Sequence, residues 1–265
     1  MPTRIQIELA GAAEILPLRE LHRQEMKCQI VHDSLHRREG WTRGYRLFVG
    51  GTVAAFGSVA LAGPWQDKPT IYEFYVLPPH RPRVFELFEV FLDASHARFL
   101  EVQSNDVLLA VLLHTYGRDV ASEKIVFADQ STTAWPSRGA QLLPLTSDEA
   151  LRTAIDQRQG GGEWRLELEG TAVATGGILF HYNLPYGDIY MEVAPPYRQQ
   201  GWGTYLVQEL KRICYELGAI PAARCNPTNH GSRRTLLKAG FLPYAHILQA
   251  TVADRPAHHD AAPDA

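Results

Sequence analysis

The fold of this chain is decided by residues 193–204, which read VAPPYRQQGWGT. This stretch joins a β-type segment, residues 188–193, to a segment in which Leu206, Leu210 and Cys214 recur at helical spacing. The first turn of a helix has backbone N–H groups without partners inside the helix, and the helix dipole is positive at that end. Because glycine also lets a ligand approach the backbone closely, the stretch predicts an anion site that suits a pyrophosphate.

The spacing of this turn differs from that of two common phosphate-binding motifs. A P-loop has Gly-Lys before its Ser or Thr, but here Gly203 is followed directly by Thr204. A dinucleotide-binding fingerprint has a third glycine, and that position is Leu206. The turn instead has Arg198 three residues before Gly201, in the order Arg-x-x-Gly-x-Gly. This order resembles the acyl-CoA-binding turn of the GNAT family of N-acetyltransferases.

A second block of sequence strengthens the resemblance. Residues 224–232 read RCNPTNHGS, and residues 236–241 read LLKAGF. They are similar to the family's second conserved block, in which a strand ends near an asparagine and a helix then leads to Gly-Phe. The two blocks cover about residues 188–245 in the family's order. The resemblance implies a mixed α/β fold, a twisted and mostly antiparallel sheet flanked by helices, with acetyl-CoA as co-substrate and no metal.

The chain also repeats part of its own sequence. Residues 45–57 (YRLFVGGTVAAFG) resemble residues 164–176 (WRLELEGTAVATG) at an offset of 119. Both read as a strand, a glycine turn and a strand, which predicts a hairpin. Residues 75–81 (YVLPPHR) resemble residues 192–198 (EVAPPYR) at an offset of 117. Repetition in the same order predicts two tandem copies of one α/β domain.

The repeat sets the predicted domain boundaries. A third match pairs residues 103–113 with residues 224–238, in the same order as the first two. Pro136 and Gly139 lie between the copies and indicate a linker. We therefore expect a degenerate GNAT-like domain at residues 1–130, a linker at 131–139, an acetyl-CoA-binding GNAT domain at 140–253 and a disordered tail at 254–265.

The two copies differ where the pyrophosphate would bind. Val84 stands at the position of Gly201 (201 − 84 = 117), and its side chain would crowd a phosphate. Pro82, two residues earlier, removes a backbone donor. We therefore expect the N-terminal copy to have lost the CoA site and to serve as a packing partner and one wall of the acceptor cleft.

The resemblance also implies which groups bind acetyl-CoA. In the family, the strand before the turn diverges from its neighbour, and its free N–H groups hold the pantetheine arm and polarise the thioester carbonyl. Arg198 either adds positive charge or is a surface arginine, and Asn229 either contacts the CoA arm or only caps a helix. The residues expected at this site are Met191, Val193, Arg198, Gln199, Gln200, Gly201, Trp202, Gly203, Thr204, Asn229 and Ser232.

The resemblance leaves the acid and the base open. Many family members protonate the departing sulfur with a tyrosine four residues before the Gly-Phe glycine, but this chain has Leu236 there. A thiolate, whose conjugate thiol has a pKa of about 8.5, can also depart without an acid. The candidate acids that remain are Tyr190, Tyr205, Cys225 and His230, although Cys225 also reads as a small buried residue. Family members often place a carboxylate on this strand as the general base, and here the strand carries Asp188 and Glu192. Of the two we favour Glu192.

Composition argues against several other classes of protein. The chain has 265 residues, of which 45% are apolar, and its 26 basic and 29 acidic residues give a net charge of −3, so no basic surface for nucleic acid is expected. Three cysteines without framework spacing indicate reduced thiols and a cytoplasmic protein. The N-terminus has no apolar signal core, and no apolar run of 18 residues is present for a membrane span. His32 and His36 have a spacing found in metal sites, but no third ligand accompanies them.

Two local patterns predict further structure. Thr146 and Glu149 have the spacing of a capping box, which predicts the start of a helix behind Thr146. Residues 160–162 are three successive glycines, which predict a flexible loop.

The predicted function is transfer of an acetyl group from acetyl-CoA to an amine, by direct attack in a ternary complex. The expected acceptor is a small-molecule or peptide amine, with no nucleic-acid or membrane partner. Three alternatives stay open. The first is a non-catalytic acyl-CoA-binding or sensing module, which the missing tyrosine favours. The second is an enzyme that transfers succinyl, propionyl or a longer acyl group. The third is a nucleotide-binding enzyme of Rossmann type.

Overall fold

Both hairpins predicted from the repeat are present. The computed structural model describes residues 4–253, and in it β2 (Thr42–Val49) turns into β3 (Thr52–Ala60). In the second copy, β8 (Gly161–Leu168) turns into β9 (Thr171–Leu179). Each hairpin has a register shift shortly before its turn, after Leu47 and after Leu166, which are equivalent positions (166 − 47 = 119). The tail predicted to be disordered lies outside the described residues.

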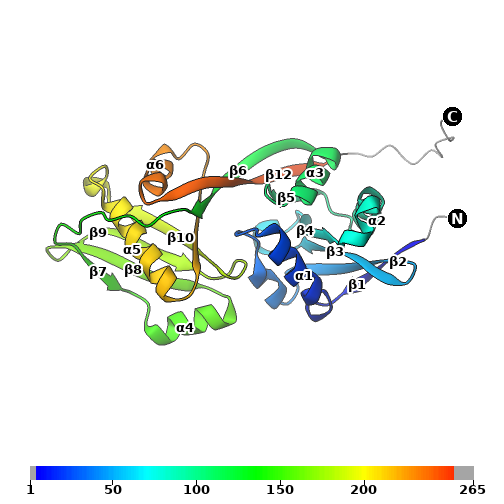
Figure 1. Cartoon of the computed structure of the whole chain (residues 1–265), viewed down its shortest axis with the longest axis horizontal. Helices are drawn as coiled ribbons and strands as arrows, with labels where there is room; N and C mark the ends of the chain where they lie inside the picture. Colours follow the sequence, from blue (N-terminus) through cyan, green and yellow to red (C-terminus); the bar gives the residue numbers. More distant parts are fainter. Residues whose placement is uncertain (1–3, 254–265) are drawn as a thin grey trace.

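The other elements follow the same order in both copies, which form two lobes lying side by side along the long axis (Figure 1). The N-terminal lobe also contains β1 (Ile5–Ala10), α1 (Ala12–Met26), η1 (Asp33–Arg37), η2 (Gly63–Trp65), β4 (Thr70–Val76), η3 (Pro78–Arg83), α2 (Val84–Ser95), β5 (Phe99–Gln103), α3 (Val107–Tyr116) and β6 (Gly117–Asp129). The C-terminal lobe also contains β7 (Gln141–Pro144), α4 (Asp148–Gln157), β10 (Tyr186–Val193), η4 (Pro195–Tyr197), α5 (Trp202–Glu216), β11 (Ile220–Cys225), α6 (His230–Lys238) and β12 (Phe241–Val252). The predicted fold class is confirmed. Within residues 4–253, no helix combines the length and the apolar character that crossing a membrane requires.

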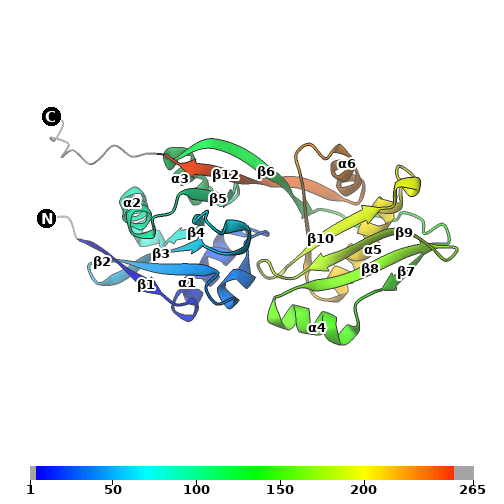
Figure 2. The ribbon, with the colours of Figure 1, turned by 180° about the vertical axis from the view of Figure 1, so that it is seen from behind.

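All the strands join one sheet, in the order β1-β2-β3-β4-β5-β12-β6-β11-β10-β9-β8-β7. β12, from the end of the C-terminal lobe, lies between β5 and β6. β6, from the end of the N-terminal lobe, lies between β12 and β11. The lobes therefore exchange their last strands, and Figure 2 shows β6 and β12 crossing from one lobe to the other. Two neighbouring pairs, β4–β5 and β10–β11, are parallel.

The predicted linker connects β6 to β7 and lies along α5. The backbone N–H of Trp135 donates to Gln208 Oε1 of α5 at 2.7 Å, and the Lys211 ammonium of the same helix donates to the carbonyl of Ser131 at 2.7 Å. The connection is thus fixed to the C-terminal lobe. The boundaries at residues 130 and 140 stay a prediction.

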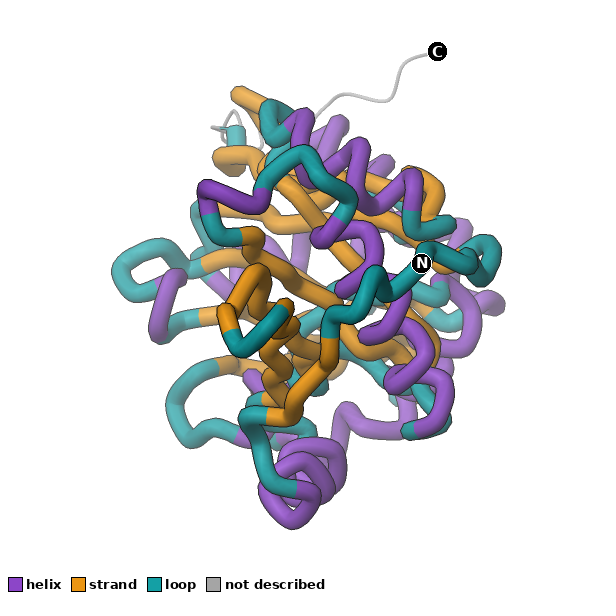
Figure 3. The backbone as a smooth tube through the Cα atoms, turned by 90° about the vertical axis from the view of Figure 1, so that its left-hand side faces the viewer, coloured by secondary structure: helices purple, strands orange, loops and turns teal. Residues whose placement is uncertain are grey.

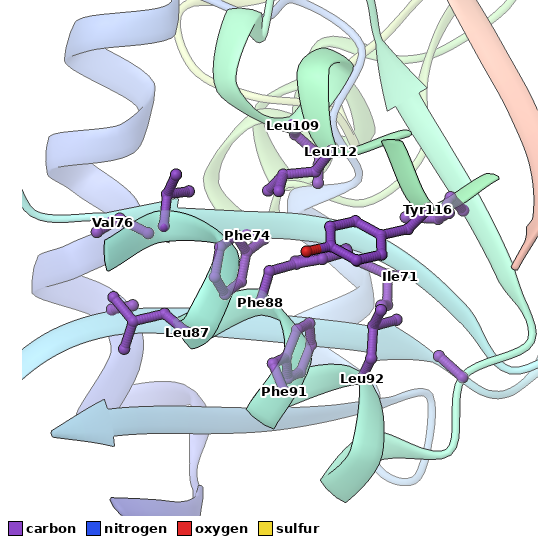
Figure 4. Packing of buried hydrophobic residues seen from close by; sticks show 14 of the residues in the cluster. Ile71, Phe74, Val76, Leu87, Phe88, Phe91, Leu92, Leu109, Leu112 and Tyr116 are labelled. Atoms are coloured by element: carbon purple, nitrogen blue, oxygen red, sulfur yellow. The ribbon is translucent and has the colours of Figure 1, made fainter. Parts of the chain in front are cut away.

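The N-terminal lobe packs α2 and α3 on one face of the sheet. Figure 4 shows Phe88 and Phe91 of α2 and Leu112 of α3 gathered around Phe74 of β4, all of them buried. The rings of Phe74 and Phe91 are stacked, with centroids 5.5 Å apart. A Cβ at Gly57 of β3 would lie 2.4 Å from the Phe91 ring, so only glycine lets the helix come this close to the sheet.

The C-terminal lobe packs α5 on β9 and β10 through the face that the helical spacing predicted. Leu206, Leu210 and Cys214 are buried there, and burial of each leucine contributes about 2 kcal/mol. A Cβ at Gly176 of β9 would lie 3.1 Å from Leu210 Cδ1, which shows how closely the helix lies on the strand. Seen along the long axis, the strands run through the interior and helices lie around them (Figure 3).

A buried pair joins α1 to α3. His22 Nε2 lies 2.7 Å from Asp106 Oδ2, and Asp106 Oδ1 accepts the backbone N–H of Leu109 at 3.1 Å, which caps α3. Burial by itself lowers the pKa of His22, but the charge and the hydrogen bond of Asp106 raise it, so that the net shift is upward. His22 therefore holds its proton more tightly in the folded chain than in the unfolded chain.

We expect the free energy of unfolding to fall as the pH rises above neutrality. A raised pKa means that the stabilisation from His22 is complete below the pKa of an unfolded histidine, about 6.5, and is lost as the pH rises through the raised value. Urea denaturation between about pH 6 and about pH 9 measures this. In His22→Gln this part of the pH dependence should be absent, and an unchanged dependence would contradict the assignment.

The predicted capping box is wrong. α4 begins one residue later than expected, because Ser147 is its N-cap and the Ser147 side chain accepts the backbone N–H of Ala150 at 3.3 Å. Thr146 Oγ1 instead accepts the backbone N–H of Glu163 at 2.9 Å. The hydroxyl of Thr146 therefore ties the start of α4 to β8.

The predicted glycine loop is also wrong in part. Gly161 and Gly162 are the first residues of β8. A Cβ at Gly161 would lie 2.1 Å from the carbonyl oxygen of Ile178, and one at Gly162 would lie 2.6 Å from the Trp164 ring. These glycines are thus needed for close packing rather than for flexibility.

Candidate functional site

The parallel pair of strands in the C-terminal lobe separates halfway along β10. β10 pairs with β11 from Tyr186 to Ile189, where Ile189 lies beside Ala223. Beyond that point β10 continues beside β9 as far as Val193. The edge of β10 that faces β11 therefore has no strand partner over its last residues.

This free edge presents two backbone donors. The N–H of Ala194 donates to the carbonyl of Val173 in β9 at 3.0 Å. In an antiparallel pair, the residues that bond to a given neighbour alternate along the strand. Met191 and Val193 therefore direct their N–H groups away from β9, toward the side on which β11 has diverged. These are the donors that the sequence predicted for the pantetheine arm and the thioester carbonyl, and that role stays a prediction.

The turn after β10 carries a row of unpaired donors. Gln199 (φ 63°) and Gly201 (φ 93°) are both left-handed, and Gly201 is the N-cap of α5. The helical bonding begins where the N–H of Tyr205 donates to the carbonyl of Gly201 at 3.0 Å. Within the described residues, no backbone N–H of residues 199–204 has an acceptor. Successive donors at the positive end of a helix, without an acidic residue in its first turn, form an anion site.

Three side-chain contacts hold this turn in shape. Arg198 Nε donates to the carbonyl of Val193 at 3.0 Å, and Gln200 Nε2 donates to the carbonyl of Pro196 at 3.1 Å. From the predicted linker, Arg138 Nη1 donates to the carbonyl of Gln200 at 2.9 Å. Two guanidinium groups therefore lie at the turn and add positive charge to its backbone donors.

The second glycine of the motif has a different task from the first. A Cβ at Gly203 would lie 3.1 Å from Val193 Cγ2 and 3.4 Å from Thr235 Cγ2. The missing side chain lets the start of α5 approach β10 and α6. Gly201 thus supplies a left-handed backbone and Gly203 supplies close packing.

The N-terminal lobe retains the frame of this turn. The N–H of Leu77 donates to the carbonyl of Ala54 at 2.9 Å, as Ala194 does in the second lobe. Arg81 Nε donates to the carbonyl of Val76 at 3.2 Å, which reproduces the contact of Arg198 (198 − 81 = 117). The matching bonds confirm that the two lobes repeat one structure.

The donors of the turn are lost in the N-terminal lobe. Pro82 takes the position of Gln199 (199 − 82 = 117), and proline has neither an N–H nor access to the left-handed region. α2 begins directly at Val84, which replaces Gly201 and is buried in the core. The Arg81 guanidinium is held by Glu25 at 2.6 Å. The N-terminal turn therefore lacks these donors, and the loss of a CoA site in this copy stays a prediction.

The predicted residues on and before α6 lie close together. Asn229 Oδ1 accepts the backbone N–H of Ser232 at 3.0 Å and so caps the helix. Cys225 is buried at the end of β11, where burial raises the pKa of its thiol and a hydrogen bond with Ser232 opposes the shift. Leu236, at the position of the family's tyrosine, is buried in the core. Any contact of Asn229 or Ser232 with CoA stays a prediction.

The predicted base and one candidate acid lie on the other face of β10. Because side chains alternate along a strand, Asp188, Tyr190 and Glu192 point away from the face that α5 covers. Tyr190 is 41% exposed, and its hydroxyl would lie 2.8 Å from a Cβ at Gly177, so the ring lies over β9. Glu192 is exposed. Cys225 belongs to the core cluster instead and bonds to Ser232 of α6, so the structure does not bring it beside these side chains.

An ion pair next to this face was not predicted. Asp188 is buried, and its Oδ2 accepts from Arg224 Nε at 3.1 Å. Burial raises the pKa of Asp188 to about 6, while Arg224 opposes the shift. Arg224 Nη2 also donates to the hydroxyl of Tyr182. Arg224 belongs to the second sequence block, but nothing in the sequence indicates that it pairs with Asp188 across the sheet.

A cavity of about 520 Å³ lies between the lobes, and we call it the central cavity. Arg224 and Tyr182 line it from the C-terminal lobe. The N-terminal lobe and the exchanged strands supply other lining residues, among them His32, Trp65, Glu101, Glu123 and Gln249. The cavity therefore begins beside the point where β10 leaves β11, because Arg224 directly follows the last paired residue, Ala223. Sequence reasoning missed these lining residues, because the strand exchange brings them together.

The histidines with metal-site spacing have other partners. Within residues 4–253, no group of three or more His, Cys, Asp or Glu side chains is placed to hold a metal ion. His36 Nε2 lies 2.7 Å from Glu73 Oε2. His32 packs against Trp65 and Tyr182, with ring centroids 5.1 and 4.7 Å away. Burial lowers the pKa of His32 to about 3, so this ring is neutral near pH 7.

Comparison with known proteins gives one family and one fold. Residues 129–241 match the sequence model of the acetyltransferase (GNAT) family. No curated protein is significantly similar to the chain. A solved acetyltransferase of the GNAT family from Colwellia psychrerythraea has a TM-score of 0.68 and 14% identity, over 94% of this chain and 100% of that one.

Two further solved structures have the same fold over almost the whole chain. A tandem GNAT protein from the clavulanic acid biosynthesis pathway has a TM-score of 0.63 and 13% identity, over 96% of this chain and 100% of that one. A GCN5-related N-acetyltransferase from Sphaerobacter thermophilus has a TM-score of 0.59 and 16% identity, over 97% of this chain and 98% of that one. At these identities the likeness concerns the fold.

Proposed function

We propose that this chain, whose residues 129–241 match the acetyltransferase (GNAT) family and whose fold is that of a tandem GNAT protein, transfers an acetyl group from acetyl-CoA to an amine. One observation carries the proposal: the backbone donors of residues 199–204 and the free edge of β10 follow each other directly along the chain. The donors of residues 199–204 suit the pyrophosphate of CoA, and the free edge of β10 suits the pantetheine arm and the thioester that extend from it. In the N-terminal lobe the donors of the turn are lost, so we assign a single acetyl-CoA site.

The proposed reaction is direct attack in a ternary complex. The amine nitrogen forms a bond to the thioester carbonyl carbon, the carbon–sulfur bond breaks, and the proton that leaves the nitrogen balances the thiolate that leaves as CoA. The N–H groups of Met191 and Val193 are the proposed donors to the carbonyl oxygen as it gains charge. A backbone donor placed in this way is worth about 3 kcal/mol of barrier.

Binding and transfer test this proposal in two steps. A ligand that binds only the folded state at about 100 times its Kd adds about 2.7 kcal/mol of stability, which raises the melting temperature by several degrees. We expect acetyl-CoA to do so and NAD not to. Release of free thiol with a panel of amines then measures transfer. Binding without transfer to any amine would favour the alternative, a non-catalytic acyl-CoA-binding module. A larger rise in melting temperature with succinyl- or propionyl-CoA would show that the protein prefers that acyl group to acetyl.

We expect Glu192→Gln to lower kcat by about 100-fold or more, because general-base catalysis contributes about that much, while the melting shift with acetyl-CoA stays unchanged. Asp188→Asn is the comparison. If Asp188 were the base, kcat/KM would rise with pH through about 6, where the buried carboxyl loses its proton, and Asp188→Asn would remove that limb. A full rate in Glu192→Gln would rule out the assignment of Glu192.

A further inference from the structure

The central cavity holds a carboxylate without a cationic partner. Glu101 of β5 accepts hydrogen bonds from Gln249 Nε2 at 3.0 Å and from Trp65 Nε1 at 3.4 Å. Both donors are neutral, and within residues 4–253 no lysine, arginine or histidine forms an ion pair with Glu101, although the charge of Arg224 acts on it from a greater distance. Burial raises the pKa of this carboxyl. Glu101 is partly buried, and a negative charge in such a place with only neutral hydrogen-bond donors is best stabilised by a cation that enters from the cavity.

A second carboxylate lies on the same side of the cavity. Gln249 Nε2 also lies 3.3 Å from Glu123 Oε2, so one amide nitrogen bridges Glu101 and Glu123. Glu123 is paired through its other oxygen with Lys124 at 3.0 Å, which leaves Oε2 directed toward Gln249. The negative charge of this wall is therefore shared between β5 and β6, and the exchanged strand β12 lies between them and supplies the bridging Gln249.

The other walls favour an organic cation. Trp65 and Tyr182 both line the cavity, and an aromatic ring face attracts an ammonium group. The Arg224 guanidinium already lies over the Tyr182 ring, 4.8 Å from its centroid, so Trp65 is the ring left for a ligand. His32 lies between Trp65 and Tyr182 and is neutral, because burial lowers its pKa to about 3. The positive charge of Arg224 is already balanced by Asp188 at 3.1 Å. Three carboxylates, Glu101, Asp119 and Glu123, and two cations, Lys68 and Arg224, line the cavity, so its lining carries more negative than positive charge.

We propose that the acceptor carries a second cationic group besides the amine that it presents to the thioester, and that this group binds in the central cavity beside Glu101, Glu123 and Trp65. The inference rests on the proposed function, and it assigns the N-terminal lobe a part in acceptor recognition. The reacting amine enters past Arg224, which lies both in the cavity wall and beside the divergence of β10 and β11. The second cation takes no part in the bond changes of the transfer.

Two amines that differ in one charge test this proposal. The probes are 1,4-diaminobutane, with two ammonium groups, and 1-aminobutane, with one. We expect the full chain, titrated calorimetrically without acetyl-CoA, to bind the diamine at least about 10 times more tightly, because the partly buried ion pair with Glu101 is worth more than an exposed one. In the transfer assay, KM for the diamine should be lower by a similar factor.

Glu101→Gln should raise Kd and KM for the diamine about 10-fold and leave both constants for the monoamine unchanged. Glu123→Gln should have a smaller effect in the same direction, and it serves if Glu101→Gln does not fold. The matched control is Glu20→Gln, which removes an exposed glutamate of α1 and should leave both amines unaffected.

The inference would be overturned if the two amines bound equally, or if Glu101→Gln did not change the Kd of the diamine. The proposed function would still stand if acetyl-CoA bound and 1-aminobutane were acetylated. Diamine binding that needs Glu101 but leads to no transfer, with acetyl-CoA bound, would overturn the acceptor assignment. A chain that does not bind acetyl-CoA would overturn the proposed function.

Discussion

Gly201→Val is expected to abolish acetyl-CoA binding, with a loss of affinity of about 100-fold or more. Gly201 has φ 93° at the N-cap of α5, and a β-branched residue in that region is a steric outlier. Valine therefore forces the turn to rearrange, and the donors of residues 199–204 no longer converge on one anion. Calorimetric titration with acetyl-CoA measures the loss, and the melting shift should disappear with it.

A second glycine with a positive φ serves as the control, because it separates the effect of backbone strain on stability from the effect on acetyl-CoA binding. Gly218, just beyond α5, has φ 71°, and a Cβ added there would have no other atom within 4 Å. Gly218→Val thus imposes a similar backbone cost, about 1–2 kcal/mol, at a place without ligand donors. It should lower stability and leave acetyl-CoA affinity intact. Val84→Gly should add no second site, because Pro82 still lacks an N–H. Unchanged affinity in Gly201→Val would defeat the site assignment.

Arg19→Met is expected to lower the free energy of unfolding by about 3–5 kcal/mol. The Arg19 guanidinium is buried between Glu73, at 2.9 Å, and Asp33, at 3.0 Å. Burial by itself raises the pKa of Glu73, but Arg19 and His36 lower it below its usual range. Removal of the arginine leaves two buried carboxyl groups without their main cation. Urea denaturation near pH 7 measures the loss.

The comparison is Arg46, a partly buried arginine whose ion-pair partners are exposed. Arg46 lies 2.6 Å from Glu8 and 2.8 Å from Glu14, and both glutamates are about half exposed to solvent. Arg46→Met should therefore cost about 1 kcal/mol or less. Equal losses in the two variants would show that the buried cluster does not depend on Arg19. In the double variant Arg19→Met with Glu73→Gln, part of the stability should return, because one unpaired charge is gone.

The sequence predicted those parts of the site that depend on neighbouring residues. The left-handed Gly201, the unpaired donors of residues 199–204 and the start of α5 all follow from a local pattern of strand, glycine turn and amphipathic helix. The hairpins followed from the repeat for the same reason. Where the pattern was ambiguous by one residue, as at Thr146 and Ser147, the choice depended on whether a hydroxyl bonds to its own helix or to a neighbouring strand.

The parts that the sequence could not predict depend on which distant strands become neighbours. Asp188 and Arg224 meet across the parallel pair of strands, and Glu101 meets Glu123 through Gln249 only because β12 lies between β5 and β6. An internal repeat suggests two separate sheets, and it does not indicate that the two copies exchange their last strands. The central cavity was therefore beyond sequence reasoning, although one wall of an acceptor cleft was expected from the N-terminal copy.

The exchanged strands set an order of events during synthesis. The ribosome produces β5 and β6 long before residues 241–252, which supply the strand between them. Until then the edge of β5 has no neighbour, and an open edge of this kind invites pairing with other chains. A nascent polypeptide interrupted before residue 241 thus leaves an unfinished first half as well as an unfinished second half, and the two halves reach their native state together.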